Sequence, residues 1–253
     1  MSFDVSAAAY LSFMGRFSEP LATLFADWSG VRPGQRALDV GCGAGALTEQ
    51  LVARLGASSV TAVDPSAPFV AALEERLPGV DVRLAGAERL PFAEGRFDAV
   101  LAQLVIHLIP DAVPAVREMA RVTRPGGRVA ACVWDHAGDR GPLATFWSAV
   151  HDLDPDEPGE ATMPGTRDGD LADLFVEAGL VDVESSSLTV TRHYDSFENW
   201  WQPYLLGVGP AGSYVAGLSD EQRSALRDRC AQLLPATSFD VSARAWCARG
   251  AAA

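Results

Sequence analysis

Lysine is absent from the 253-residue sequence, so its 20 basic residues are all arginines, set against 33 aspartates and glutamates. The formal net charge is −13, and no run of arginines forms a basic stripe. Because an acidic surface repels phosphate backbones, this charge argues against nucleic acid as a partner. The absence of lysine is itself explained more simply by a GC-rich coding bias than by function.

Long apolar runs are also missing. The stretch 100–109 is interrupted by Gln103 and His107, and no stretch approaches the roughly 20 residues of a membrane span. The N-terminus lacks a basic segment followed by an apolar block, so the sequence predicts no signal peptide. The cysteines are widely spaced and form no CxxC pair, which argues against a metal site or disulfides. We therefore expect a cytoplasmic protein that neither contacts a membrane nor holds a metal.

What the sequence does contain is enough apolar material for one large α/β domain, since hydrophobic residues make up 48% of it. Between residues 36 and 134, short β-branched runs alternate with longer segments of helical periodicity. This alternation is typical of a mainly parallel sheet with helices on both faces. Strands are expected at 36–40, 59–63, 80–84, 97–101 and 128–134, and helices at 47–55, 67–77 and 112–122.

The regular alternation ends after residue 135. Residues 152–170 are rich in proline, glycine and acidic side chains, and we expect them to form an exposed excursion. The segment 197–234 combines helical patches with several aromatic residues and does not fit the strand–helix rhythm. The remaining expected elements are an N-terminal helical segment at 6–28, a helix at 170–179, and strands at 181–190 and 239–246.

A glycine-rich segment, Leu38-Asp39-Val40-Gly41-Cys42-Gly43-Ala44-Gly45, joins the first expected strand to its helix. In open parallel sheets, ligands bind beyond the carboxyl ends of the strands. Glycines there let the backbone approach a ligand closely and expose amide groups at the start of a helix. The spacing of Gly41, Gly43 and Ala46 also fits a dinucleotide fingerprint, so an NAD-dependent oxidoreductase stays open as an alternative.

Two acidic residues bear on this choice. Asp39 lies near the end of the first strand, where a buried carboxylate needs a partner. An ammonium group, as in a methionine-derived ligand, or a network of ligand-bridging waters would supply one, whereas the pyrophosphate of a dinucleotide would be repelled. Asp64 ends the second strand and could accept hydrogen bonds from ribose hydroxyls in either kind of site. Asp39 therefore favours the methionine-derived ligand.

At these residues the chain resembles the class I S-adenosylmethionine-dependent methyltransferases, particularly the branch typified by quinone-biosynthesis C-methyltransferases. The resemblance covers residues 35–134, and its four blocks are specific in this order and spacing. They are Leu38-Asp39-Val40-Gly41-Cys42-Gly43-Ala44-Gly45; Val63-Asp64-Pro65-Ser66; Glu88-Arg89-Leu90-Pro91-Phe92 with Phe97-Asp98-Ala99-Val100; and Arg124-Pro125-Gly126-Gly127-Arg128.

The resemblance implies S-adenosylmethionine as the methyl donor and S-adenosylhomocysteine as the product. It implies that the glycines wrap the methionine moiety, that Asp39 holds its amino end and that Asp64 binds the ribose diol. The family's usual acid beside the adenine is replaced here by Gly86, which leaves the amide of Ala87 or the side chain of Glu88 to serve that ring. The implied cofactor-binding residues are Asp39, Gly41, Cys42, Gly43, Gly45, Asp64, Pro65, Ser66, Gly86, Ala87, Glu88 and Gln103.

Methyl transfer mainly requires alignment of the acceptor and exclusion of water, and a general base only for some acceptors. His107 is the candidate base, with a structural histidine as the alternative, and His136 is a second candidate. Acceptor-binding residues are expected in the N-terminal segment and in the late aromatic segment, where core packing is an equal alternative for the tryptophan pair. They are Tyr10, Met14, Arg16, Trp200, Trp201 and Tyr204. For Arg16, a clamp on the cofactor carboxylate and a solvated surface position both stay open.

These observations predict an enzyme that methylates a small organic acceptor, as a monomer or a homodimer. A cofactor-binding protein of the same fold without transfer activity is the remaining alternative. The expected fold class is α/β, a doubly wound, seven-stranded, mostly parallel sheet, in a single domain over residues 1–253. Its expected parts are an N-terminal helical lid (1–34), a cofactor-binding core (35–134), the rest of the sheet with a loop excursion (135–194), a helical insertion on the substrate side (195–235) and a final strand (236–253).

Overall fold

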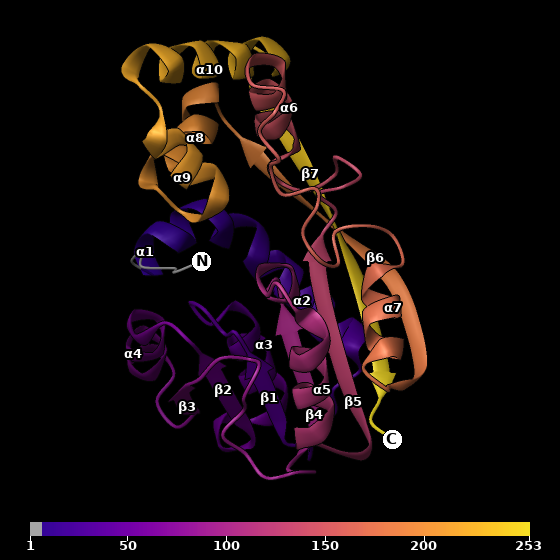
Figure 1. The fold of residues 1–253 in the computed structure, drawn as a ribbon. Coiled ribbons are helices and arrows are strands. Elements are labelled where there is room, and N and C mark those ends of the chain that lie inside the picture. Colours follow the sequence, from indigo (N-terminus) through magenta and orange to yellow (C-terminus); the bar gives the residue numbers. More distant parts are fainter. Residues whose placement is uncertain (1–6) are drawn as a thin grey trace.

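A seven-stranded sheet forms the centre of the computed structural model, which describes residues 7–253 (Figure 1). The strand order is β3-β2-β1-β4-β5-β7-β6. Neighbouring strands run parallel, except that β7 is antiparallel to both β5 and β6. The expected doubly wound, mostly parallel seven-stranded sheet is confirmed. The strands are β1 (Ala37–Val40), β2 (Val60–Asp64), β3 (Asp81–Leu84), β4 (Phe97–Gln103), β5 (Thr123–Trp134), β6 (Val181–Tyr194) and β7 (Phe239–Ala251).

The helices follow the predicted pattern in the first half of the chain and add elements in the second. The sequence did not predict α6, and the late aromatic segment contains α8, α9 and α10. The helices are α1 (Ala7–Tyr10), α2 (Arg16–Ser29), α3 (Ala46–Leu55), α4 (Ala67–Arg76), α5 (Ala112–Val122), α6 (Ala144–Leu153), α7 (Asp170–Glu177), α8 (Phe197–Trp201), α9 (Gly209–Gly217) and α10 (Asp220–Leu233). Shorter turns are the π-helical η1 (Leu11–Gly15) and the 3-10 turns η2 (Ala57–Ser59), η3 (Ile106–Leu108) and η4 (Gln202–Leu206).

Three strands depart from their expected bounds by more than two residues. β5 begins at Thr123 rather than at residue 128; Thr123 pairs with Phe97 before the register shifts, so residues 124–127 form a bulge within the strand. β6 and β7 are longer than expected because they pair with each other almost along their whole length, from Val181 with Ala251 to Tyr194 with Phe239. This ribbon extends past the parallel strands and supports the upper helices in Figure 1.

Side chains of the central strands alternate between two cores, one on each face of the sheet, because successive residues of a strand point to opposite sides. In β4, Ala99 and Leu101 join the core that contains α2 and α3, whereas Val100 and Ala102 join the core that contains α5 and α7. Strand β5 alternates in the same way. Both faces are therefore covered, which explains why these strands are apolar throughout rather than alternately polar.

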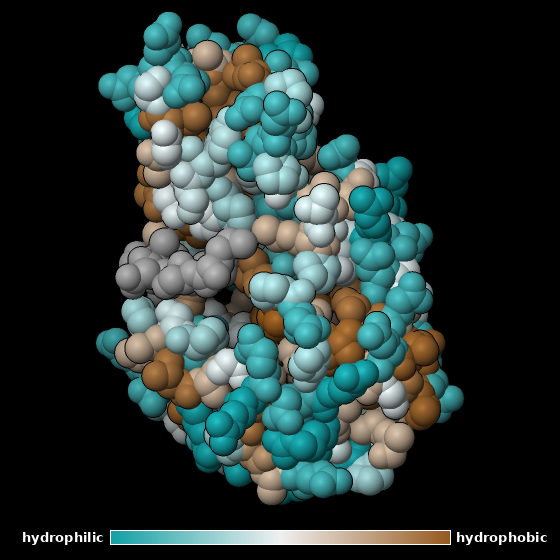
Figure 2. Space-filling view, in the orientation of Figure 1, coloured by the Kyte–Doolittle hydropathy of each residue, from teal (hydrophilic) through white to brown (hydrophobic). Residues whose placement is uncertain are grey.

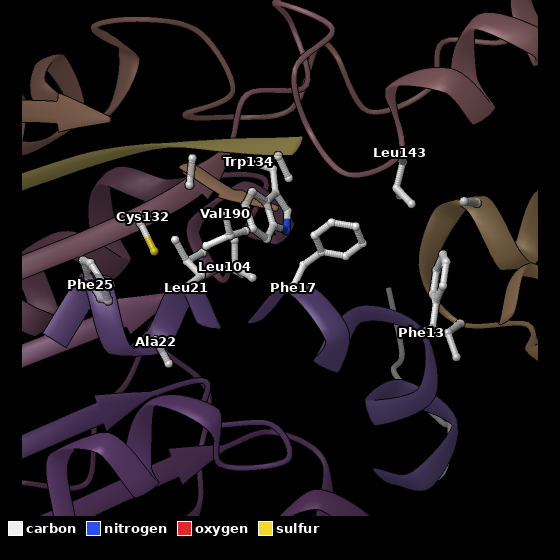
Figure 3. Packing of buried hydrophobic residues seen from close by; sticks show 14 of the residues in the cluster. Phe13, Phe17, Leu21, Ala22, Phe25, Leu104, Cys132, Trp134, Leu143 and Val190 are labelled. Carbon is white, nitrogen blue, oxygen red and sulfur yellow. The ribbon is translucent and has the colours of Figure 1, made fainter. Parts of the chain in front are cut away.

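Helix α2 packs against one face of the sheet and forms part of the core there. Figure 3 shows Phe17, Leu21 and Phe25 pointing from this helix toward the strands, where Cys132 and Trp134 lie. The rings of Phe17 and Trp134 meet edge to face with 6.3 Å between their centroids. These side chains are nearly inaccessible to solvent, so the N-terminal segment is part of the core as well as a cover over the edge of the sheet.

The excursion expected at residues 152–170 is only partly exposed, which corrects the prediction. Glu160 is 4% exposed and Thr166 is fully buried. The carboxylate of Glu160 accepts a hydrogen bond of 2.7 Å from the indole nitrogen of Trp147 on α6. The hydroxyl of Thr166 donates to the carbonyl oxygens of Ala161 and Met163. Proline, glycine and acidic composition indicated irregular backbone correctly, but these specific partners draw two polar residues inward.

Within the described residues, 7–253, none of the helices combines the length and the apolar character that crossing a membrane requires.

Candidate active site

A cavity of about 550 Å³ lies at the carboxyl ends of β1, β2 and β4. The strand order reverses between β1 and β4, and ligands of open α/β sheets bind at such a switch point. Figure 2 shows the surface hollowed between the part of the molecule that contains α4 and the helices above it. The fold therefore presents one large concave site where the sequence placed the glycine segment.

The glycine segment is held against β2 by its backbone. The amides of Gly41 and Cys42 both donate to the carbonyl oxygen of Val63, at 2.8 and 3.0 Å. Gly41 has a φ of 71°, and a Cβ atom there would lie 2.4 Å from a methyl group of Val105. A side chain at this position would therefore be strained and would also clash, so the close approach of the loop to Val105 requires glycine.

Asp39 lines the cavity from the end of β1 and is 1% exposed. Its Oδ2 atom accepts a hydrogen bond of 2.6 Å from the hydroxyl of Thr48 on α3. Burial, and to a lesser degree the nearby Asp64, raise the pKa of this carboxyl from 3.8 to about 7. A carboxylate in this position is costly unless a cation joins it, because desolvation disfavours the charged form.

Asp64 faces the same cavity from the end of β2. Its Oδ2 accepts from the amide of Gly43 and its Oδ1 from the amide of Ser66, both at 2.8 Å. Burial raises the pKa of Asp64, while these two amides act in the opposite direction. Each carboxylate oxygen can accept more than one hydrogen bond. The side chain is thus fixed with capacity left for two hydroxyl donors from a ligand.

Most of the other sequence-predicted cofactor residues line this cavity with Asp39 and Asp64. They are Gly41, Cys42, Gly43, Pro65, Ser66, Gly86, Ala87, Glu88 and Gln103. Burial raises the pKa of the Cys42 thiol well above its usual range, which keeps it protonated and fits packing rather than nucleophilic chemistry. Gln103 donates from Nε2 to the carbonyl oxygen of Ser18 at 2.9 Å, which ties α2 to the floor of the cavity.

Gly45 is the exception among the predicted cofactor residues, because it does not line the cavity. It precedes α3 with a φ of 91°, and a Cβ atom there would lie 2.4 Å from Leu73 of α4. The small residue is required by the approach of α4 to the loop rather than by contact with a ligand.

Two supporting residues were missed by the sequence reasoning. Thr48 orients Asp39, and Arg76 of α4 donates a hydrogen bond of 2.6 Å to the carbonyl oxygen of Ala44 while it pairs with Glu49. Each residue contacts a part of the chain outside its own helix, and such contacts are not visible in the sequence. The one feature that could have pointed to Thr48 is its place on the inner face of the helix that follows the glycine loop.

The N-terminal candidates separate in the structure. Tyr10 lines the large cavity, and its ring meets Phe69 of α4 edge to face at 5.7 Å, so α1 reaches across the opening. Met14 lines a second cavity of about 60 Å³. Arg16 instead donates to the backbone and side-chain oxygens of Asn199, each at 3.2 Å. Arg16 therefore connects α2 to α8 and does not line the large cavity, so the geometry gives no support to a clamp on the cofactor carboxylate.

The late aromatic residues pack among themselves. Trp200, Trp201 and Tyr204 are each 2% exposed, and the ring of Tyr204 stacks on Phe146 with 4.6 Å between centroids. None of the three lines either of the two cavities described here. The geometry thus supports core packing between the upper helices, which is the alternative that the sequence left open for the tryptophan pair.

The two candidate bases lie together beside the smaller cavity. His107 follows β4 in η3 and His136 follows β5, with 5.9 Å between their ring centroids. Both are buried, at 8% and 7% exposure, so His136 is not a solvated loop residue. Burial, and secondarily the charge of His136, lower the pKa of His107 to about 3, so its imidazole is neutral at physiological pH.

The two carboxylates, the glycine loop and the switch-point cavity together fit an adenosyl-sulfonium donor. Among residues 7–253 Asp39 has no cationic partner, and Asp64 has accepting capacity for a ribose diol. The sheet order, with its antiparallel β7, and this cradle define a class I methyltransferase.

The comparisons with known proteins agree with the geometry. Residues 38–131 match the family described as a methyltransferase domain. The chain is 33% identical over 235 residues to an uncharacterized methyltransferase of Mycobacterium tuberculosis, covering 92% of this chain and 86% of that one. It is 40% identical over 103 residues to a demethylmenaquinone methyltransferase of Beutenbergia cavernae, covering 41% and 42% of the two chains. The YcgJ protein of Bacillus subtilis has the same fold, with a TM-score of 0.58, 19% identity and coverage of 91% and 97%.

The chain therefore belongs to the class I S-adenosylmethionine-dependent methyltransferases. Family membership decides against the NAD-dependent oxidoreductase that the glycine spacing had left open. The donor is S-adenosylmethionine, and the enzyme performs methyl transfer.

Proposed function

We propose that the large cavity binds S-adenosylmethionine through Asp39 and Asp64 and that the methyl group passes to a small organic acceptor in the smaller cavity. The observation that carries this proposal is the convergence of both carboxylates and the glycine loop on one concave site. When bound, the donor supplies an electrophilic methyl group on a sulfonium. The chain's own residues have to bind, orient and exclude water.

The roles of the two acids follow from their surroundings. Asp39 is buried and has no positively charged partner in the part of the chain that the structure describes, so an ammonium group at Oδ1 or Oδ2 would remove the cost of ionising it. Asp64 is already aligned by the amides of Gly43 and Ser66. Two hydroxyl groups on adjacent carbons match its two oxygens. This arrangement would place the amino acid end of the donor below α3 and the ribose beside β2.

Glu88 is proposed to take the place of the acid that the resemblance expected at Gly86. A Cβ atom built on Gly86 would lie 2.8 Å from the Oε2 atom of Glu88. The carboxylate of Glu88 thus bends back over Gly86 and occupies the space in which an acidic side chain at 86 would begin. From there it would accept a hydrogen bond from the exocyclic amine of adenine, while Ala87 packs beneath the ring.

A small acceptor is favoured by the size and lining of the second cavity. It is about 60 Å³ and is lined mainly by apolar and aromatic side chains, with His107, His136 and Glu160 among its polar groups. Tyr10, Leu104 and Leu108 line both cavities, so the two spaces are neighbours. The net charge of −13 disfavours nucleic acid as the acceptor. The division into lid, core and insertion, a monomeric or homodimeric state and a cytoplasmic location belong to the same proposal.

The proposal is tested by methyl transfer from donor carrying an isotopic label to a panel of small phenols, alcohols, amines and quinone precursors. Label in at least one organic product, absent with Asp39→Asn, supports it. Binding of S-adenosylhomocysteine without transfer to any member of a broad metabolite extract would instead favour a protein that binds the cofactor without transferring the methyl group.

A further inference from the structure

Three buried side chains converge beside the smaller cavity from separate parts of the chain. His107 follows β4, His136 follows β5, and Glu160 comes from the segment before α7. One ligand atom of each lies within 4.8 Å of the others. None of the three residues is more than 8% exposed, so this is not a solvated surface cluster.

The polar atoms of this cluster do not satisfy one another. The Nδ1 atom of His107 is buried and has no hydrogen-bond partner among residues 7–253. The Nε2 atom of His136 lies 4.0 Å from the Oε1 atom of Glu160, which is longer than a hydrogen bond. A buried polar atom without a partner costs about 1–3 kcal/mol. Such groups in a folded protein call for a further partner.

We propose that His107, His136 and Glu160 form a binding site for a divalent transition metal. Two imidazoles and one carboxylate are a ligand set for such ions, with a coordination position left open. At metal–ligand distances of about 2.0–2.2 Å, tetrahedral ligand atoms lie roughly 3.3 Å apart. The widest pair in the cluster is within 4.8 Å, so small side-chain rotations bring the three atoms to an ion.

Trp147 supports the carboxylate in the way that metal sites require. Its indole nitrogen donates to the Oε2 atom of Glu160 at 2.7 Å, and both side chains are buried. This bond fixes the orientation of the carboxylate and leaves Oε1 directed at His136. Hydrogen bonds of this kind orient metal ligands and tune affinity.

The open position faces the space where the acceptor is proposed to bind, and this part of the inference rests on the proposed function. The cluster lines the smaller cavity, which shares Tyr10, Leu104 and Leu108 with the large one. A metal there would hold an acceptor through an oxygen atom and lower the pKa of its hydroxyl. The acceptor class is therefore a hydroxyl-bearing organic molecule small enough for an apolar pocket.

The test is a calorimetric titration of the full chain, freed of any affinity tag and of metal, with ZnCl2, and a parallel titration with CoCl2 followed by visible absorption. We expect one tight site and the absorption of a low-coordinate Co2+ complex. His136→Gln and Glu160→Gln should each weaken Zn2+ binding at least 100-fold, and Trp147→Phe should weaken it about 10–100-fold. His193→Gln is the matched control, because His193 is exposed and pairs with Asp240.

Wild-type protein that binds no Zn2+ above the level of nonspecific surface sites overturns the proposal without recourse to any variant. So does tight binding that survives both His136→Gln and Glu160→Gln, provided that circular dichroism shows them folded. S-adenosylhomocysteine is titrated into the same samples. If a variant loses Zn2+ binding while its affinity for S-adenosylhomocysteine is unchanged, the metal site is separate from the donor site. Either proposal can therefore fail alone.

Discussion

Replacing Asp39 by asparagine should stabilise the ligand-free protein at neutral and alkaline pH. Asp39 is buried, and its pKa is raised from 3.8 to about 7. The folded protein therefore binds a proton here that the unfolded chain has released between these values, so wild-type stability falls as pH rises from about 4 through 7. A change of pKa from 3.8 to about 7 sets an upper limit of about 4 kcal/mol on this loss of wild-type stability, because each unit of pKa corresponds to about 1.4 kcal/mol.

The Asp39→Asn variant keeps an oxygen for the hydroxyl of Thr48 but carries no charge. Its stability advantage over the wild type should be absent near pH 4 and grow to a few kcal/mol at pH 8. Urea unfolding at pH 5 and pH 8, with S-adenosylhomocysteine absent, measures this difference. Affinity for S-adenosylhomocysteine should fall in the same variant, because the ammonium loses its charged partner. An advantage of equal size at both pH values would refute the reasoning.

Three further changes address the site and the core. Asp64→Asn turns an amide group toward the donating amides of Gly43 or Ser66 and should weaken binding of S-adenosylhomocysteine at least about tenfold, measured by calorimetry; unchanged affinity would contradict the ribose role. Gly41→Ala should lower both the melting temperature and this affinity, through positive φ and the clash with Val105, and Val105→Ala in the same chain should restore only part of the loss. Trp201→Ala should cost about 3–5 kcal/mol of stability in urea unfolding and leave the affinity for S-adenosylhomocysteine unchanged. A loss of acceptor affinity without destabilisation would instead support the acceptor-binding role of Trp201.

The sequence predicted the parallel half of the sheet closely because its signals are local. Apolar runs that end at glycine or proline mark β1 and β2, and the glycine loop follows directly from its residue types. The extent of β6 and β7 was underestimated, since those strands are lengthened by pairing with each other. The helix α6 was missed because its sequence carried no clear start signal beside the irregular segment that follows it.

The structure gives the site predictions least support where a role depends on contacts between distant segments. Arg16 and Trp201 have residue types that suit ligand binding. In the structure, however, Arg16 donates a hydrogen bond to Asn199, and the ring of Trp201 stacks on that of Tyr204. The expectation of no metal site rested on the lack of CxxC pairs, and cysteine spacing carries no information about His107 and Glu160, which meet only in the fold; the zinc titration tests that expectation. Composition placed Glu160 on the surface, and its hydrogen bond to Trp147 draws it inside.

The most direct test of the donor site is calorimetric titration of the wild-type chain with S-adenosylhomocysteine and, separately, with NADH, at pH 8. The account predicts one site for S-adenosylhomocysteine, no heat of binding for NADH, and marked weakening in both Asp39→Asn and Asp64→Asn. Failure of the folded wild type to bind S-adenosylhomocysteine would contradict the claim that these carboxylates hold the donor. So would an affinity for S-adenosylhomocysteine in both variants that equals the affinity of the wild type.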